Sequence, residues 1–175
     1  AVLVFAACDL SVTNPGPVQD GFLDDAGAFP AVVNGAKRSF ALAYTRFALD
    51  AAMTGLEALP GGLFGGSEFD GGTLTSDNVG DHWTNMQKGR WVAENGAQRL
   101  EDAGESGSAA HSELLLLAAY ANRSMGHNMC TAIFDGGDPS DFMDYFSRAE
   151  AQFTQVISAA GGTALGDQAL AGRAD

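Results

Sequence analysis

The chain has 175 residues, enough for one domain of ordinary size with a substantial hydrophobic core. It carries 22 Asp and Glu residues against 9 Lys and Arg residues, and its formal net charge of -13 disfavours binding to nucleic acids, whose phosphates would repel it. The longest apolar stretch beyond the N-terminal residues, 114–119, is far shorter than the about 20 residues that cross a bilayer. Composition therefore predicts a soluble body with an acidic surface.

The first eight residues form the most informative short segment. An apolar run over residues 2–5 is followed by Ala6, Ala7 and Cys8. A signal peptidase requires small side chains beside the scissile bond, and a mature bacterial lipoprotein begins at an acylated cysteine. The pattern predicts Cys8 as a lipidation site, with residues 1–8 as the end of a signal peptide and its lipobox. Two or three acyl chains would anchor the protein stably to a membrane, because one chain alone is marginal.

The alternative interpretation of this segment is a short buried strand over residues 1–7, because short apolar runs are ambiguous by periodicity. Since seven residues precede Cys8, either the precursor numbering is retained or an uncleaved apolar segment must be buried. The only other cysteine is Cys130, which has no intramolecular partner if Cys8 is acylated. A disulfide framework is therefore not expected.

Residues 9–29 are predicted to be an extended tether. Pro15 and Pro17 fix the backbone and restrict the residues before them, and an acidic turn follows over residues 20–25. The helical domain is expected over residues 30–175. We expect it to be incomplete at its C-terminus, because the pattern of a further helix begins near residue 166 and is cut short.

Hydrophobic periodicity predicts four complete helices in this domain, separated by glycine pairs. The third is apolar on several sides and is expected to be the central helix. The fold class is thus all-α, built from antiparallel helical hairpins that are tetratricopeptide-like in size and joined by long Gly-rich loops. The four helices are expected over residues 30–59, 82–103, 109–130 and 141–160, with cap candidates at Asp81, at 106–109 and at Ser140 or Asp141.

Two glycines interrupt the second predicted helix. Gly89 and Gly96 each weaken a helix by about 1 kcal/mol relative to alanine. We therefore expect another helix to approach closely at both positions. The buried face of the second helix is predicted to comprise Trp83, Met86, Leu100 and either Trp91 or Val92.

Two groups of residues have spacings that resemble metal-ligand sets. His127 and Cys130 are three residues apart, which places them on one helix face, but a buried free thiol beside a satisfied histidine explains them better. Asp135, Asp138 and Asp141 surround a glycine turn and could offer oxygens to calcium. Because the EF-hand pattern with its terminal glutamate is absent, a solvated turn with a helix cap is favoured.

No combination of residues predicts catalysis. His82 and His111 lie near predicted helix starts, where capping or surface roles are expected. The chain contains no Gly-x-Ser-x-Gly sequence, phosphate-binding loop or dinucleotide fingerprint, and no nucleophile is paired with a base in the pattern. We therefore predict a non-enzymatic protein without catalytic residues, metal or cofactor.

Three aromatic residues are candidates for contact with a ligand or partner. Phe64 and Phe69 stand isolated in the Gly-rich segment 60–80, and Trp83 follows that segment. Aromatic rings can stack on sugars or fill a partner's pocket. The alternative for the two phenylalanines is that they anchor the loop on its own domain, and the alternative for Trp83 is core packing.

In the order of its elements the chain resembles the N-terminal part of a SusD/RagB-family lipoprotein. The residues that carry the resemblance are Phe5-Ala6-Ala7-Cys8, Phe22-Leu23-Asp24, Val32-Val33-Asn34-Gly35-Ala36, Asp81-His82-Trp83 with Asn95, and Ala118-Ala119-Tyr120-Ala121-Asn122-Arg123. The resemblance covers nearly all of the chain but only about the first third of a family member. The region that supplies most ligand contacts in the family is missing, so no binding residue is carried over.

This resemblance implies a lipid-anchored component of nutrient uptake at the outer membrane, on the cell surface or the periplasmic face. Its expected partner is a TonB-dependent outer-membrane transporter, and its expected ligand is a glycan or a peptide that is captured and handed over without covalent chemistry. The competing hypothesis is a structural helical lipoprotein subunit bound stably to another membrane complex.

Overall fold

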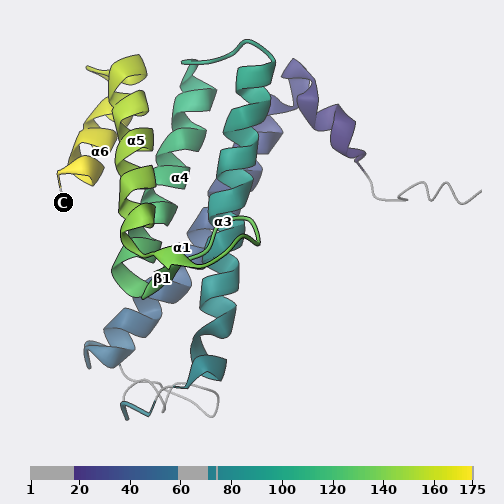
Figure 1. Cartoon of the computed structure of the whole chain (residues 1–175). Coiled ribbons are helices and arrows are strands. Elements are labelled where there is room, and N and C mark those ends of the chain that lie inside the picture. The colour runs from purple at the N-terminus through teal and green to yellow at the C-terminus, as the bar shows by residue number, and fades with distance from the viewer. Residues whose placement is uncertain (1–17, 59–70, 74, 175) are drawn as a thin grey trace, which may run out of the picture.

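The computed structural model describes residues 18–58, 71–73 and 75–174, without the side chains of residues 76–79. Within these residues the chain is all-α, as predicted, with five α-helices packed together (Figure 1). The helices are α1 (Phe29–Thr54), α3 (Ser76–Asp102), α4 (Ala109–Asn128), α5 (Met143–Ala160) and α6 (Ala164–Arg173). Two 3-10 helices, η1 (Asp20–Asp24) and η2 (Ala26–Ala28), precede α1, and two short strands, β1 (Thr131–Ala132) and β2 (Ser140–Asp141), pair antiparallel before α5.

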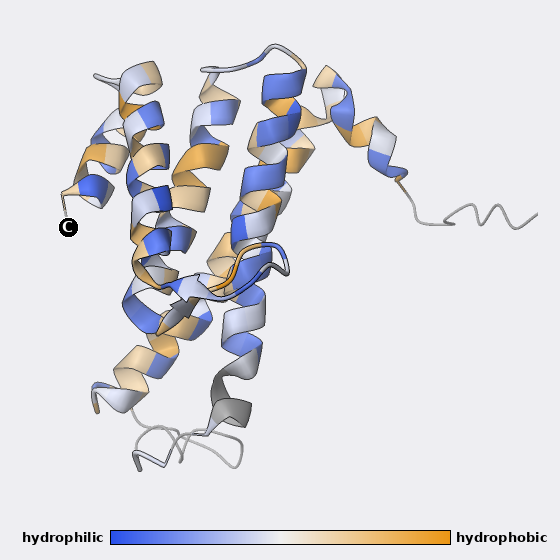
Figure 2. Cartoon of the chain, in the orientation of Figure 1, coloured by the Kyte–Doolittle hydropathy of each residue, from blue (hydrophilic) through white to orange (hydrophobic). Residues whose placement is uncertain are grey.

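The helix α4 is the central element, as its sequence predicts. It packs against α1, α3, α5 and α6. Figure 2 shows hydrophobic residues along much of α4, which fits a helix with neighbours on several sides. Leu114, Ala118, Ala121 and Met125 are fully buried along its length.

Two hydrophobic clusters form the core at different levels of the bundle. The first joins Val33 of α1, Leu100 of α3, Leu114 of α4 and Phe153 of α5. The second includes Met86 of α3, with further residues of α1, α4 and α5, and lies nearer the β1–β2 ladder. Through these two clusters, α1 and α3 pack on one side of α4, and α5 packs on its other side. The helices are therefore fixed to one another along their length.

The two glycines of α3 lie where other helices approach, as predicted. A Cβ atom built on Gly89 would lie 3.4 Å from the Cα of Phe40 in α1. One built on Gly96 would lie 2.9 Å from Cγ1 of Val32 and 3.1 Å from Cδ2 of Leu114. The missing side chains therefore allow α1, α3 and α4 to pack closely.

Helix boundaries follow the expected caps only in part. Ser108 caps α4, since its Oγ accepts a hydrogen bond from the His111 N–H at 3.2 Å. The Oδ1 of Asp141 accepts from the Met143 N–H at 2.9 Å at the start of α5. The helix α3 starts at Ser76, five residues before the expected cap Asp81, and α1 ends at Thr54, before the expected 59. The β1–β2 ladder was not predicted, because two-residue strands leave no periodic pattern.

Part of the predicted tether is held against the bundle. Residues 20–28 form η1 and η2, and Arg99 of α3 binds the carboxylates of Asp20 and Asp24 at 2.7 and 2.5 Å. These bonds to the Arg99 side chain raise its pKa, with Asp20 contributing most. The chain is thus attached to α3 before α1 begins. None of the described helices is long and apolar enough to cross a membrane.

Candidate functional site

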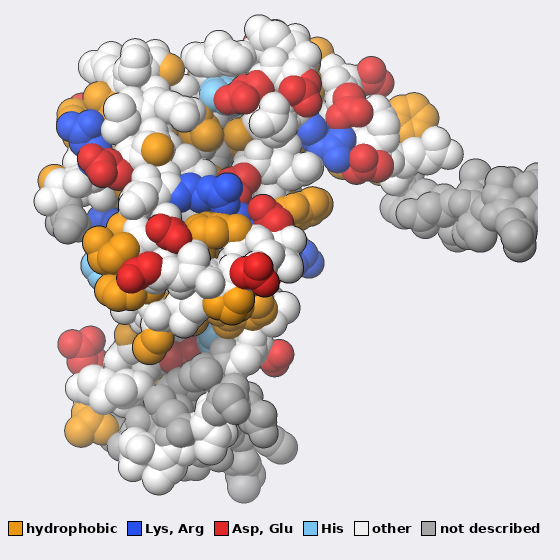
Figure 3. Space-filling model, in the orientation of Figure 1, with side chains coloured by type: hydrophobic (Ala, Val, Ile, Leu, Met, Phe, Trp, Pro, Cys, Tyr) orange, Lys and Arg blue, Asp and Glu red, His pale blue; other side chains and the backbone are white. Residues whose placement is uncertain are grey.

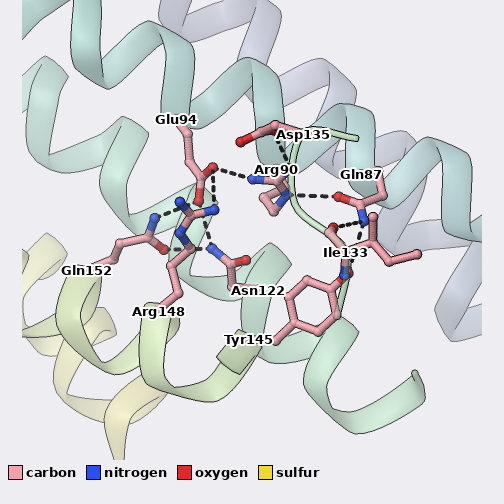
Figure 4. A network of polar contacts seen from close by, with 9 residues as sticks. All are labelled: Gln87, Arg90, Glu94, Asn122, Ile133, Asp135, Tyr145, Arg148 and Gln152. Atoms are coloured by element: carbon pink, nitrogen blue, oxygen red, sulfur yellow. Dashed lines mark hydrogen bonds and ion pairs between the residues drawn. The ribbon is translucent and has the colours of Figure 1, made fainter. Parts of the chain in front are cut away.

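Arg90 of α3 is the centre of a polar network in the middle of the bundle (Figure 4). Its side chain is only 2% exposed. The guanidinium donates from Nε to Gln87 Oε1 at 2.9 Å, from Nη1 to Glu94 Oε2 at 2.5 Å, and from Nη2 to Asp135 Oδ1 at 2.8 Å. Its buried charge is therefore matched by two carboxylates, the condition under which burial of an arginine is tolerated.

Glu94 connects three helices through its carboxylate. Its Oε1 accepts from Asn122 Nδ2 of α4 at 3.0 Å and from Gln152 Nε2 of α5 at 2.9 Å. Its Oε2 is also 3.5 Å from Arg148 Nη1 of α5. The Asn122 and Gln152 amides are bonded to each other at 2.9 Å, so α3, α4 and α5 share one hydrogen-bond network.

The loop after α4 closes over Arg90. The centre of the Phe134 ring lies 5.2 Å from the guanidinium carbon of Arg90 and 4.3 Å from that of Arg148. Asp135 follows with a φ of 53° and Gly136 with a φ of 76°, a left-handed pair that turns the chain while Asp135 reaches Arg90. The Tyr145 hydroxyl donates to the Ile133 carbonyl at 3.2 Å and fixes the start of the loop. The network thus holds the loop as well as the helices.

A shallow groove of about 290 Å³ lies between α3 and α5, beside this network. Leu115 of α4 lies on its floor, and side-chain amides and charges surround it, among them Gln98, Arg148 and Gln155. Amides can donate and accept at once, so such a groove can bind hydroxyl or peptide groups by hydrogen bonding. Asn122 Oδ1 is buried without a hydrogen-bond partner among the described residues.

The arrangement provides binding groups and positioning, and the network residues are engaged with one another. Arg90 and Arg148 face Glu94, and Arg90 also faces Asp135, so positive and negative groups are balanced. Among the network residues drawn in Figure 4, no hydroxyl or thiol nucleophile is paired with a histidine or carboxylate base. The charged and amide groups of this site can support recognition through charge-assisted hydrogen bonds.

Of the three residues predicted to contact a ligand or partner, the structure describes only Trp83. Trp83 is half-buried and packs against the second hydrophobic cluster. Cys8, Phe64 and Phe69 lie outside the described residues. Trp91, expected as an alternative to Val92 on the buried face of α3, is 51% exposed, whereas Val92 packs against the core.

The two proposed ligand groups are separated by the structure. α4 ends at Asn128, so His127 and Cys130 do not share a helix face, and the prediction of a buried thiol is wrong because Cys130 is exposed. Asp135 binds Arg90, whereas Asp141 accepts the Met143 N–H just before α5, whose N-cap residue is Phe142. Within the described ranges no group of three or more His, Cys, Asp or Glu residues is placed to hold a metal ion.

The two other histidines stabilise contacts at opposite ends of α3. His111 accepts the Gly107 N–H on Nδ1 at 3.2 Å, so its Nε2 donates to Glu101 at 3.0 Å and ties the α3–α4 turn. His82 lies against Asp50 of α1. Burial raises the pKa of the Asp50 carboxyl, and His82 and then Arg46 act in the opposite direction.

The polar network was not predicted from the sequence. Its signal is nevertheless visible, because Arg90 falls on the same helical face as Met86 and Ala97, and Glu94 follows four residues after Arg90. An ion pair with this spacing on an apolar face indicates a buried pair rather than a solvated one. The partners on α4 and α5 leave no such local pattern.

Comparison with known proteins gives no relatives for this chain: no family model, no curated protein and no solved structure matches it.

Proposed function

We propose that this chain belongs to a lipid-anchored, non-enzymatic binding protein that captures a glycan or peptide nutrient for a TonB-dependent outer-membrane transporter. The observation that carries the proposal is the packing of successive antiparallel helices, α3 on α4, α4 on α5, and α5 on α6. Stacked helical hairpins of this kind are typical of tetratricopeptide-like scaffolds, which bind partners on extended surfaces. The resemblance to SusD/RagB lipoproteins supplies the specific role.

Some of the positions that carry the resemblance lie at helix interfaces, whereas Phe22 and Asp81 are exposed. Val33 and Ala36 of α1 are buried in the first cluster, and Ala118 and Ala119 of α4 lie in the same cluster. Asn122 bonds Glu94 and Gln152. These residues therefore support the proposal through the scaffold they build, and ligand selectivity is assigned to other surfaces.

The predicted anchor would act at a defined end of the bundle. Arg99 fixes the chain to α3 at Asp20, which is 12 residues after Cys8 (20 minus 8). A fully extended segment of this length spans at most about 40 Å. With Cys8 acylated, the end of the bundle at which α1 begins and α3 finishes would lie within that distance of the membrane, and a transporter in the same membrane would be reachable.

A structural subunit remains the second candidate, and an exposed face of α1 favours it. Leu42 and Leu49 are 59% and 46% exposed and lie seven residues apart, on one side of the helix. Acidic side chains are scattered over the face of the molecule seen in Figure 3, whereas α1 contains only one acidic residue, Asp50. Thr45 and Arg46 lie between the two leucines on this face and are also exposed, so the face combines apolar and polar groups of the kind found at protein interfaces.

The proposal is tested by isolating the complete natural protein from its own membranes in mild detergent and identifying its stoichiometric partner by mass spectrometry. We expect a TonB-dependent transporter at about one copy per copy of the protein. A Cys8→Ser variant should appear in the soluble fraction, because the anchor is lost. A stoichiometric complex with an unrelated membrane assembly would support the structural subunit and contradict nutrient uptake.

A further inference from the structure

The groove between α3 and α5 follows both helices. All residues of its described lining belong to α3, α4 and α5. Glu94 of α3 bonds Gln152 of α5, and a Cβ built on Gly107, in the turn after α3, would lie 3.9 Å from the Cβ of Ala159 near the end of α5. The two helices therefore run in the same direction (Figure 1). Along α3 the groove extends over two helical turns, about 10 Å from Glu94 to Glu101.

Glu101 gives the groove a negative end. The Gly107 N–H donates to Nδ1 of His111, so Nε2 of the same ring carries a proton and donates it to Glu101 Oε1 at 3.0 Å. A histidine that accepts at one nitrogen and donates at the other is neutral. Glu101 therefore keeps its negative charge. The buried His111 holds the Glu101 side chain in position, and 38% of that side chain stays exposed.

The opposite end of the groove has no such excess of charge. Glu94 lies there near both Arg90 and Arg148, and Arg90 also binds Asp135, so two positive and two negative groups meet. Glu101 contacts a neutral histidine instead. Charge complementarity therefore favours a positive group at the Glu101 end of a ligand and a neutral group at its other end.

The space between the two ends suits a peptide backbone. The side-chain amides of Gln98 and Gln155 are exposed along the groove, and each can donate and accept hydrogen bonds. Ala97 and Ala151 are small and leave room for a backbone to approach. An extended chain advances about 3.5 Å per residue, so about three residues match the length of the groove. The described lining contains no aromatic ring on which a sugar could stack, which favours a peptide over a glycan.

We propose that this groove binds the N-terminal segment of a short peptide. Its free α-ammonium lies at Glu101, and the next two residues extend toward Glu94 between Gln98 and Gln155. The inference rests on the proposed function and deepens it, because it selects a peptide rather than a glycan as the captured nutrient. The bond between Glu94 and Gln152 fixes the distance between α3 and α5, so the width of the groove is set before a peptide arrives.

The test compares two peptides that differ only at the N-terminus, trialanine amide and N-acetyl-trialanine amide. Each is titrated into the ¹⁵N-labelled 175-residue chain and followed by amide chemical shifts, at a pH below about 7, where the free α-amino group is charged. We expect saturable shifts over residues 94–101 and 148–155. The free peptide should bind about fivefold more tightly, because only its ammonium forms a charge-assisted hydrogen bond with Glu101. Equal affinities, or shifts located elsewhere, would overturn the proposal.

Glu101→Gln separates this contact from the general attraction of an acidic protein for a cation. The glutamine keeps an oxygen that can accept from His111, so the turn is retained, but the affinity for the free peptide should fall nearly to that for the acetylated one. Glu105→Gln is the matched control, because it removes the same charge from an exposed residue outside the lining. An equal loss of preference in the two variants would contradict the assignment.

A further pair of variants tests the position of the site. Ala151→Phe should fill the groove and abolish binding of both peptides, whereas Ser158→Phe, at an exposed position of α5 outside the lining, should not. Retained binding in Ala151→Phe would place the peptide elsewhere and overturn the proposal. If Ala151→Phe does not fold, the Glu101→Gln result decides alone.

Maltotriose is the glycan probe in the same titration. We expect it to leave the groove residues unshifted, and shifts at these residues with maltotriose but with neither peptide would show that the peptide assignment is wrong. None of these results changes which membrane complex the natural protein forms. Failure of the groove proposal is therefore distinguishable from failure of the proposed function, which the isolation of that complex tests.

Discussion

Arg90 shows how one residue can organise an otherwise apolar bundle. It is nearly inaccessible to solvent, and its hydrogen bonds reach Gln87 and Glu94 on its own helix and Asp135 on the loop after α4. A buried ion pair adds little net stability compared with an apolar replacement of both partners, but loss of one partner leaves the other charge buried. Arg90 should therefore be sensitive to substitution although it contacts no ligand in the proposed function.

Arg90→Met is expected to lower the free energy of unfolding by about 3 kcal/mol, because Glu94 then loses its closest counter-charge. Arg99→Met is the matched control on the same helix, since Asp20 and Asp24 are exposed and a pair of this kind contributes under about 1 kcal/mol. Urea unfolding followed by circular dichroism measures both. Equal losses in the two variants would contradict the structural role assigned to Arg90.

Asp50 provides a test in which pH is the variable. Burial raises its pKa above the usual 3.8, so the folded protein holds this proton more tightly than the unfolded chain does. Protonated Asp50 contributes its full stabilisation of the folded state below pH 3.8. This stabilisation is lost as the pH rises through the raised pKa. Asp50→Asn removes this titration, so the variant should gain stability relative to the wild type as pH rises from the acidic range to neutrality.

Urea unfolding at a series of pH values follows that difference. Asp81→Asn is the control, because Asp81 is an exposed carboxyl on α3, next to His82. A stability difference between Asp50→Asn and the wild type that does not change with pH would show that burial of Asp50 does not control its titration.

At the scale of single residues, the sequence predicted packing better than it predicted polar contacts. Met86 and Leu100 are buried where periodicity places them. The partners of Arg90 and Glu94 come from α4, α5 and the connecting loop, up to 58 residues away along the chain. No local pattern encodes such distances, so the candidate site emerged only when the helices were assembled.

The helices themselves are the elements that the sequence predicts best. The four complete helices, their order and the central member follow from hydrophobic periodicity, and α6 lies where the pattern of a fifth helix begins. Their ends are less certain from sequence, because α3 extends five residues into a segment whose glycine content indicates a loop.

Substitution of glycines within helices distinguishes the effect of close helix packing on stability from the effect of helix propensity. Gly96→Ala should destabilise the protein by about 1–2 kcal/mol, because the new Cβ meets the stiff Val32 side chain and the buried Leu114, and this overpacking exceeds the gain in helix propensity. Gly35→Ala on α1 meets no atom within 4 Å and should stabilise by up to about 1 kcal/mol. Thermal unfolding of both variants measures the contrast, and stabilisation by Gly96→Ala would show that the helices are less closely packed.

At the scale of the whole molecule, two clusters around α4 and the network between them produce a helical scaffold with two concave surfaces. The polar groove between α3 and α5 lies beside the network, and a second pocket is lined by residues of α4, α5 and α6, among them Phe146 and Arg173. Neither surface could be predicted from the sequence, since each one combines residues of three helices. The all-α class itself follows directly from the sequence pattern.

The attachment of η1 to α3 gives the predicted anchor a structural consequence. Arg99 holds the chain at Asp20 and Asp24, so the segment between Cys8 and Asp20 alone would set the distance from the bundle to a membrane. The proposed uptake role and the competing structural role both require that anchor. Acylation of Cys8 is therefore the claim on which the functional account depends most.

The intact mass of the protein extracted from its own membranes tests this claim most directly. The account predicts a mature chain that begins at Cys8 and carries the added mass of two or three acyl chains. A chain that retains the residues before Cys8, or one that begins at Cys8 without added mass, would contradict it.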